Sequence, residues 1–436
     1  MDKRAAAAPE ATSTGRRRGG LLWHRNFRLL WIGETVNQLG SAMAVVGVPL
    51  LAVLVLHAST FEVAALTAAA YLPWLVIGLP AGAWVDRLPC RPVMIVCDLI
   101  SAALFASIPV AAWLGVLTIG QVLAVQLIAG AANVMFMTAY QVNLPSLVTA
   151  GELVEGNAKM QGSAAAAQFG GNALGGIAAQ AVGAATALLF NAASFLVSAA
   201  CVLAIQAQVP RQAAPRKVTT LRREVAAGVA LVARDRYLRP LAMFGGIGNF
   251  ALDGFAALAV VFLVRDVGLG AAAVGLLMAV PGIAIVIGAA VARKFSTKAG
   301  SARTLLLSTL CTAPFALLVP LTGPGPRLAF YVVGVLVTAM GVGVSNVIIA
   351  TFRQSYCPAG MIGRVTATMR FVAFGATPVG ALVAGALGTA LGIRSAMWIM
   401  LSVLVLSGTV LLTPAFIRSR SLPAGRMAAG PTQVAA

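Results

Sequence analysis

Two apolar segments carry the same polar marks in the same register: NVMFMTAYQVNLP, residues 133–145, and NVIIATFRQSYCP, residues 346–358. Each begins with Asn-Val, and Thr, Gln and Pro then recur at an offset of 213 positions. A second set of aligned positions lies at an offset of 212: Gly33 with Gly245, Asn37 with Asn249, and Ser41 with Asp253. Matching offsets at two separate places predict that one unit, a little under half of the chain, occurs twice.

The composition is that of a membrane protein. Sixty per cent of the 436 residues are hydrophobic, ten per cent are charged, and the mean hydropathy is +0.92. A helix needs about 20 mostly apolar residues to cross the hydrocarbon core of a bilayer. Twelve such runs are predicted, at residues 28–56, 62–84, 93–114, 121–145, 158–181, 184–206, 240–264, 270–292, 303–322, 328–351, 365–389 and 393–416. Duplicated halves of this kind are common in secondary transporters, whose substrate site lies between them.

We therefore predict an all-α integral membrane protein with twelve transmembrane helices in two pseudo-symmetric six-helix bundles. The bundles span residues 21–206 and 240–417, and a cytoplasmic linker of residues 207–239 joins them. Within the linker, residues 218–235 have the pattern of an amphipathic helix at the membrane surface. Residues 1–20 and 418–436 are expected to be disordered tails, the first of them basic.

The net charge is +19, and most of the basic residues that produce it fall in loops on one side of the membrane. If the N-terminus is inside, only Arg265, Arg327 and Arg394 among the basic residues fall in outer loops. This positive-inside pattern predicts a multi-pass protein of a bacterial cytoplasmic membrane with both termini in the cytoplasm. The charge then faces the lipid bilayer, and nucleic acid is not an expected partner. The spacing of the five cysteines predicts neither disulfides nor a metal site.

Between the second and third runs the chain reads GAWVDRLPCRP, residues 82–92. This loop resembles the signature of the major facilitator superfamily, Gly-x-x-x-Asp-Arg followed by a basic residue. The resemblance implies a cytoplasmic gate that latches against the start of the eleventh helix. Its expected members are Gly82, Asp86, Arg87, Arg91, Asp98 and Arg364. The alternative is that these charges only end a helix at the membrane surface. In the second half, Ala292 stands where the aspartate would be, so the latch is one-sided.

Residues 144–148, 152–158, 171–176 and 193–198 resemble the branch of this superfamily that contains bacterial macrolide-type drug exporters and siderophore exporters. Two departures from the pattern of proton antiporters concern the coupling mechanism. Asn172 stands where the fifth-helix signature has proline, and residues 121–145 contain no Arg or Lys.

Polar side chains follow one face of the first and seventh runs. Glu34, Asn37, Gln38 and Ser41 are spaced by three, four and seven residues, which puts them on one face of a helix. Asn249 and Asp253 form the matching stripe. If a pseudo-two-fold axis relates the halves, both stripes line a central cavity. Further lining is expected from Asn133, Asn346, Gln168 and Asn172. Large apolar side chains at similar depths could form an adaptable wall: Tyr71, Trp74, Phe136, Met137, Phe255 and Met278.

Glu34 and Asp253 are the candidate coupling groups. A charged side chain within lipid costs several kcal/mol unless it faces a cavity or is neutralised. A carboxylate in a partly dry cavity can exchange a proton near neutral pH, so proton and substrate could compete for it. The alternative is a structural role, in hydrogen bonds to neighbouring Asn and Gln side chains or in a pair with Arg370.

These features predict a secondary active efflux transporter that exports hydrophobic or cationic small molecules by proton antiport and alternating access. It would act as a monomer, confer multidrug resistance, and use the proton gradient without a cofactor. Export of a siderophore or another endogenous metabolite is the alternative, followed by an uptake carrier or a uniporter. The sequence has no Walker-type motif for ATP. An enzyme is not expected, because His24 and His57 lack carboxylate or Cys partners nearby in sequence.

Overall fold

The computed structural model describes residues 21–85, 88–147, 152–205, 221–358 and 361–423. The predicted N-terminal tail, residues 424–436 of the predicted C-terminal tail and residues 207–220 of the linker lie outside these residues. Within them the chain is helical and no strand occurs, so the predicted all-α fold is confirmed.

Six long helices form the N-terminal half after a short 3-10 turn, η1 (Leu21–Trp23). They are α1 (Arg25–Leu54), α2 (Thr60–Val85), α3 (Cys90–Trp113), α4 (Ile119–Leu147), α5 (Leu153–Val182) and α6 (Ala184–Ala204). The linker contributes α7 (Leu221–Arg234). The C-terminal half contains α8 (Leu238–Val261) with η2 (Phe262–Asp266), α9 (Ala271–Ala299), α10 (Ser301–Thr312) with η3 (Ala313–Leu321), η4 (Gly325–Arg327), α11 (Leu328–Tyr356), α12 (Ile362–Leu391), α13 (Ile393–Ser407) with η5 (Gly408–Leu411), and α14 (Pro414–Ile417).

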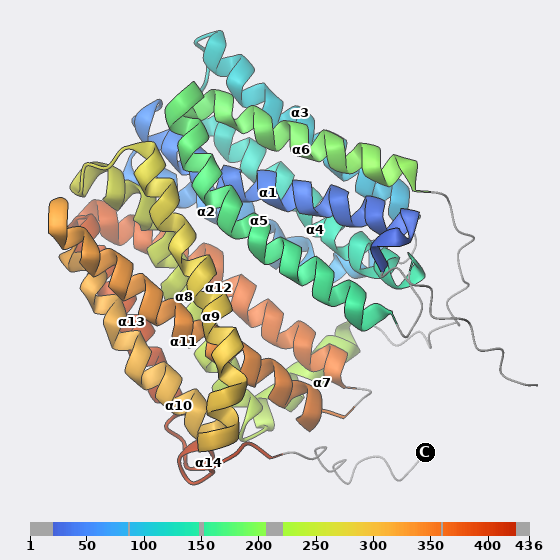
Figure 1. Cartoon of the computed structure of the whole chain (residues 1–436), viewed down its shortest axis with the longest axis vertical. Coiled ribbons are helices and arrows are strands. Elements are labelled where there is room, and N and C mark those ends of the chain that lie inside the picture. Colours follow the sequence, from blue (N-terminus) through green and yellow to red (C-terminus); the bar gives the residue numbers. More distant parts are fainter. Residues whose placement is uncertain (1–20, 86–87, 148–151, 206–220, 359–360, 424–436) are drawn as a thin grey trace, which may run out of the picture.

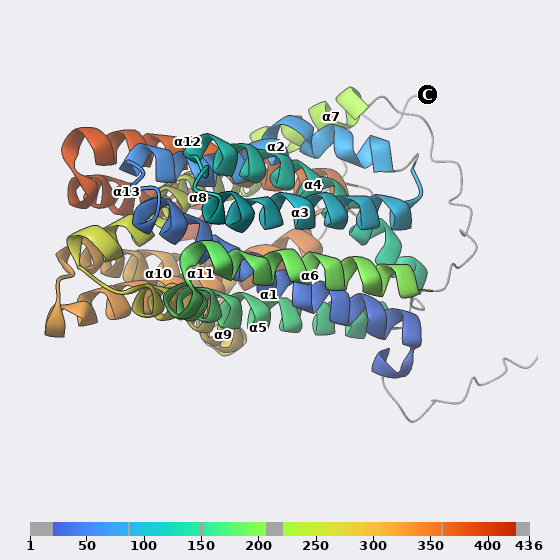
Figure 2. The same cartoon turned by 90° about the horizontal axis from the view of Figure 1, so that it is seen from above.

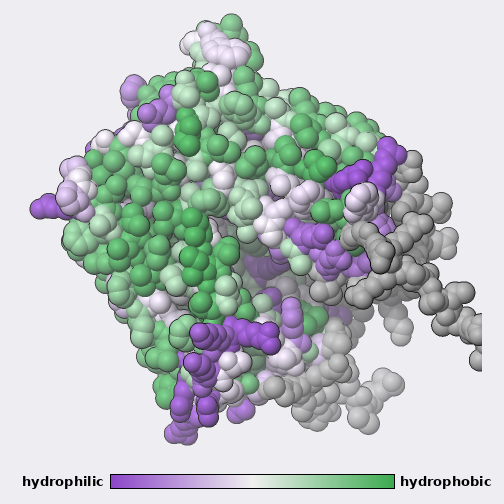
Figure 3. All heavy atoms as spheres, in the orientation of Figure 1, coloured by the Kyte–Doolittle hydropathy of each residue, from purple (hydrophilic) through white to green (hydrophobic). Residues whose placement is uncertain are grey.

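Eleven helical segments of the described residues are long and apolar enough to cross a membrane. The chain is therefore a multi-pass membrane protein, and Figure 3 shows a broad apolar surface over the helices. The fifth predicted run coincides with α5, which is 30 residues long but is not one of the eleven. Its sequence explains this, because Ala, Gly and Gln replace most of the large aliphatic side chains. These small residues let α5 pack closely between its neighbours.

The two halves pack their helices in the same order (Figure 1). In the first half, α1 contacts α5 and α6, and α4 contacts α2 and α3. In the second half, α8 contacts α12 and α13, and α11 contacts α9 and η3. The halves meet mainly through two helix pairs, α2 with α12 and α5 with α9. This repeated packing agrees with the repeated marks in the sequence.

The halves touch closely at the end of the bundle opposite α7. A Cβ added to Gly176 of α5 would lie 2.6 Å from the Cα of Gly275 of α9, and one added to Gly385 of α12 would lie 2.5 Å from the Cβ of Ala64. Only small residues permit such crossings. Arg265 also donates a hydrogen bond of 2.6 Å to the carbonyl of Ala58 in the other half. We call this the closed end.

The end that carries α7 and the start of α1 has a different arrangement (Figures 1 and 2). Figure 3 shows a hollow between the two halves on this side, with hydrophilic atoms inside it. We call it the open end. Here Gly228 of α7 packs on the first turns of α12, where an added Cβ would lie 2.7 Å from the Thr368 hydroxyl. Helix α7 is thereby fixed to the C-terminal half.

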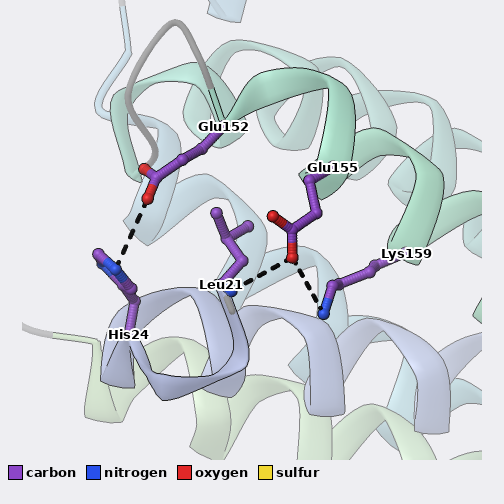
Figure 4. A network of polar contacts seen from close by, with 5 residues as sticks. All are labelled: Leu21, His24, Glu152, Glu155 and Lys159. Atoms are coloured by element: carbon purple, nitrogen blue, oxygen red, sulfur yellow. Dashed lines mark hydrogen bonds and ion pairs between the residues drawn. The ribbon is translucent and has the colours of Figure 1, made fainter. Parts of the chain in front are cut away.

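A polar network fixes the start of α1 to the start of α5 (Figure 4). The Glu155 carboxylate accepts a hydrogen bond of 3.3 Å from the backbone N–H of Leu21 and pairs with Lys159 at 3.2 Å. His24 lies 3.7 Å from a carboxylate oxygen of Glu152. These contacts are at the surface, so each contributes little to stability, but together they set the direction in which the chain enters α1.

Replacing Gly176 by Val should open the closed end, because the new side chain cannot fit against α9. We expect a cysteine placed at Thr67, which lines the central cavity described below, to become reactive from the closed-end side of sealed vesicles. The background is a variant without native cysteines, and an impermeant thiol reagent is added to each side in turn. The matched control is Gly162→Val on the same helix, where an added Cβ meets nothing within 4 Å. Equal labelling in both variants would contradict the packing argument.

Candidate functional site

A cavity of about 440 Å³ lies between the two halves and is lined by residues from both. Five of the predicted cavity residues line it: Asn37, Gln38, Ser41, Asn133 and Asp253. Of the predicted apolar wall, Tyr71, Trp74, Met137 and Met278 also line it. The cavity therefore combines amide and hydroxyl groups with aromatic and thioether surfaces, which is the usual chemistry of a small-molecule site.

Asp253 is the only ionisable carboxylate that the described residues place on the cavity wall, and no Lys or Arg lines it. It projects from the middle of α8, and the hydroxyl of Thr377 on α12 donates a hydrogen bond to it. The Thr377 side chain is buried, so this contact fixes the orientation of the carboxylate. The described lining of the cavity thus has one carboxyl group among otherwise neutral side chains.

Glu34 does not line this cavity, although it belongs to the same stripe of α1. Its side chain is only 6% exposed and points into the N-terminal half. One carboxylate oxygen accepts a hydrogen bond of 2.7 Å from the Gln38 amide. Gln38 does line the cavity, so it stands between the buried carboxylate and the substrate space. The same i to i+4 spacing joins Ser41 to Asn37 at 3.4 Å.

Asp98 of α3 lies behind Glu34, where its side chain is 1% exposed. Ser198 of α6 hydrogen-bonds to it, and its charge and that of Glu34 are near enough to repel each other. Tyr140 of α4 is also close enough to Glu34 to interact with its charge. Within the described residues, one oxygen of each carboxyl group has no hydrogen-bond partner. Two buried acids with spare acceptor atoms are costly when both are charged.

The predicted gate is only partly visible. Asp86 and Arg87 lie outside the described residues, and Gly82 lies in α2 without a description of its surroundings. Arg91 donates hydrogen bonds to the carbonyls of Val202, at 3.0 Å, and Leu203, so it covers the C-terminal end of α6. Such a contact satisfies carbonyls that the helix cannot pair itself. Arg364 lies in the first turn of α12 and lies 3.6 Å from the sulfur of Met361.

Besides Glu34, four predicted cavity residues are not among those that line it. Asn172 is buried and its amide donates to the carbonyl of Met278 at 3.0 Å, so it joins α5 to α9. The Asn249 amide donates at 2.8 Å to Gly245 of its own helix. Gln168 and Asn346 are exposed. The polar marks of the repeat therefore serve different purposes in the two halves.

Several lining residues were missed from the sequence, among them Asn191 and Phe374. Asn191 of α6 is 1% exposed, lines the cavity, and neither its amide nitrogen nor its oxygen has a partner among the described residues. An amide within an apolar run was the available signal. Phe374 of α12 stacks on Trp74 of α2, with ring centroids 5.4 Å apart and planes at 28°. This contact between two distant helices leaves no local trace in the sequence.

The Trp74–Phe374 pair also lines a second cavity of about 530 Å³ nearer the open end. We call this second cavity the mouth. Its polar lining includes Thr138, Gln141 and Gln354, and all three are among the residues that mark the sequence repeat. Because the same two rings belong to both cavities, they form the partition between the central cavity and the mouth. The pair joins α2 to α12, which come from different halves.

Comparison with known proteins agrees with this architecture. The sequence profile of the Major Facilitator Superfamily matches residues 30–380. The uncharacterized MFS-type transporter y4rN of Sinorhizobium fredii is 27% identical over 361 residues, which cover 82% of this chain and 87% of that protein. The uncharacterized MFS-type transporter YvqJ of Bacillus subtilis is 24% identical over 249 residues, 56% of this chain and 59% of that protein.

Solved structures share the fold at low identity. The crystal structure of the nucleoside transporter NupG aligns with a TM-score of 0.69 at 14% identity, over 89% of this chain and 98% of that one. A bacterial homologue of the iron transporter ferroportin, in an inward-facing state, aligns with a TM-score of 0.69 at 16% identity, over 90% and 99%. These similarities concern the fold and not the substrate.

Removing the Trp74 ring should open the partition between the mouth and the central cavity. We expect Trp74→Ala to raise, several-fold, the rate at which a water-soluble thiol reagent modifies a cysteine placed at Ser41 on the cavity wall. The control is Trp84→Ala, on the same helix but exposed at its surface. An unchanged rate in Trp74→Ala would show that the rings do not limit access.

Proposed function

Because the chain belongs to the Major Facilitator Superfamily, a family of membrane transporters, we propose that it is a proton-coupled efflux carrier for hydrophobic or cationic small molecules. It is a carrier and not an enzyme, as the family implies. The nucleoside and iron transporters that share its fold do so at under 20% identity, so their substrates are not transferred to it.

One contact supports the coupling proposal above all: the 2.7 Å hydrogen bond from the Gln38 amide to Glu34. When Glu34 is ionised, Gln38 must offer it an N–H, which leaves the amide carbonyl for the cavity. When Glu34 holds a proton, it can donate to the carbonyl of Gln38, and the amide N–H groups are then free for the cavity. The protonation state of a buried group is thereby passed to the surface that contacts substrate.

Asp98 supplies the reason why Glu34 exchanges a proton. The two carboxyl groups repel each other when both are ionised, and both are almost fully buried. Sharing one proton between them removes that repulsion. The pair then serves as one proton site of the N-terminal half, and Asp253 serves as the substrate contact of the C-terminal half.

The substrate class follows from the cavity wall. Its volume of about 440 Å³ suits a drug-sized molecule. Trp74, Phe374 and Met278 offer polarizable apolar surface, and such side chains adapt to ligands of different shape. Asp253 favours one positive charge on the ligand. A natural product or drug with an apolar body and one basic group fits these features.

We infer the orientation of the carrier in the membrane from the arrangement of charge. Basic residues occupy the open end, at the starts of α1 and α8 and the end of α9, whereas Arg265 and Arg394 lie at the closed end. The positive-inside rule assigns the open end to the cytoplasm, together with both termini. The structure is then inward-facing. Substrate enters the cavity from the cytoplasm, the proton leaves there, and a proton from outside reloads the acid pair after release of the substrate.

Substrate addition should release protons across the membrane of everted vesicles with an acidic interior. We expect a lipophilic cation such as tetraphenylphosphonium to dissipate the pH gradient in wild type, and this response to disappear in Glu34→Gln and Asp253→Asn. The measurement is the recovery of a pH-sensitive fluorescent dye. The control is Asp266→Asn, which removes a carboxylate at the closed end, outside the central cavity.

The same vesicles distinguish the alternatives. If the candidate compounds equilibrate without regard to the gradient, the protein is a uniporter and the antiport proposal fails. If only endogenous acidic or metal-chelating metabolites dissipate the gradient, the siderophore-type alternative replaces drug export.

Replacing Gln38 by Met should separate binding from coupling. Met keeps the length of the side chain but cannot bond to Glu34, so substrate can still bind near Asp253 while its binding no longer alters the proton site. We expect the affinity for tetraphenylphosphonium to change by less than about three-fold, roughly 0.6 kcal/mol. Gradient-driven accumulation in vesicles should fall to the level of passive equilibration. Normal gradient-driven transport in this variant would exclude Gln38 as the link.

A further inference from the structure

We propose that the mouth of the transport pathway contains a binding site for an oxyanion, a carboxylate or phosphate group, formed by Arg353 and Arg370. This site is separate from the cation contact at Asp253. Its existence does not depend on the proposed efflux function, which contributes only the direction in which a bound molecule would move.

Two arginines from neighbouring helices line the mouth. Arg353 lies one turn before the end of α11, and Arg370 lies in the third turn of α12. The other residues that surround them on the C-terminal half are neutral, and Gln354 and Thr366 add hydrogen-bonding groups. Thr138 and Gln141 of α4 face them from the N-terminal half. An anion in this space could accept hydrogen bonds from both halves of the protein.

The charge of these arginines is not compensated within the described residues. The polar contact of the Arg353 guanidinium is with the sulfur of Met369, at 4.0 Å, which carries no charge. Arg370 forms no ion pair or hydrogen bond in the described part of the chain. No carboxylate of the described residues lines the mouth, and the two guanidinium groups repel each other.

Two like charges on one concave wall create a strong local preference for an anion. Arginine is suited to bind one, because its planar group donates two parallel hydrogen bonds to a carboxylate or phosphate. Arg353 is half-buried, so its charge is less screened than one at the surface. Binding of an oxyanion between the two groups would replace their repulsion by two attractive contacts.

Aromatic side chains in the mouth further restrict the kind of ligand that fits there. Trp74, Phe371 and Phe374 line the same space as the two arginines. An organic acid with a flat apolar body could therefore rest on the rings while its acidic group meets the guanidinium groups. In a molecule with both an acidic and a basic group, the acidic group would meet the two arginines in the mouth. The basic group would meet Asp253, which lies beyond the Trp74–Phe374 partition.

Anion access to Trp74 tests this site. In a full-length variant that retains Trp74 as the only one of its six tryptophans, quenching by iodide, an anion, is compared with quenching by neutral acrylamide. The arginines should concentrate iodide near the ring, so the ratio of the two quenching constants should fall about three-fold or more in Arg353→Gln and in Arg370→Gln. Arg370→Lys, which keeps the charge, should retain most of the effect. The control Arg303→Gln, exposed on α10, should not change the ratio.

Competition then identifies the oxyanion. Added benzoate or inorganic phosphate, at constant ionic strength, should protect Trp74 from iodide in wild type but not in the arginine variants. Nanodiscs of phosphatidylcholine alone and with phosphatidylglycerol separate the sources. Protection that requires phosphatidylglycerol assigns the site to a lipid headgroup, and protection by benzoate without it assigns the site to a soluble acid.

Two results would overturn the proposal. An equal iodide-to-acrylamide ratio in wild type, Arg353→Gln and Arg370→Gln would show that the arginines attract no anion. A ratio that rises in Asp86→Asn, with no competition by benzoate or phosphate before that change, would show that the chain's own loop carboxylate occupies the arginines. Unchanged melting temperatures of the variants would establish that neither result comes from misfolding.

Discussion

The close approach of helices at glycine positions is the constraint on which the rest of the structure depends. Gly176 meets Gly275 where α5 crosses α9, and Gly385 meets Ala64 where α12 crosses α2. In lipid, helices gain little from burial of apolar surface, so association depends on contact between their backbones. These crossings close one end of the bundle and leave the other end apart. The central cavity, its partition and its mouth all follow from that one-sided closure.

The acids and bases of the described interior are divided between the halves. The N-terminal half holds the buried pair Glu34 and Asp98, and the C-terminal half presents Asp253 and the two arginines of the mouth. The helix packing is repeated, but the chemistry is not. In the proposed mechanism, this division lets one half respond to protons while the other contacts substrate, and the two functions need to meet only at the cavity surface. Gln38 lies at that meeting point.

The sequence predicted the fold well because apolar length and charge asymmetry are local properties. The helix bounds lie close to the predicted runs, and only α5 differs in apolarity because its role is close packing. Periodicity also placed Asn37, Gln38 and Ser41 on the cavity wall. It could not show that Glu34 turns inward toward α3, because a helical stripe is wide enough to face both a cavity and a neighbouring helix. Asp98 was assigned to the gate by its nearness to the loop, whereas its contact with Ser198 depends on how α3 packs against α6.

The central claim is that substrate in the cavity and a proton on the Glu34–Asp98 pair exclude each other through Gln38. Proton release on substrate binding tests it most directly, with purified protein in weakly buffered detergent and a pH indicator. We predict release of about one proton per chain when tetraphenylphosphonium saturates wild type, and none in Glu34→Gln at equal occupancy. Saturation of wild type without proton release, or equal release by Glu34→Gln, would contradict the account.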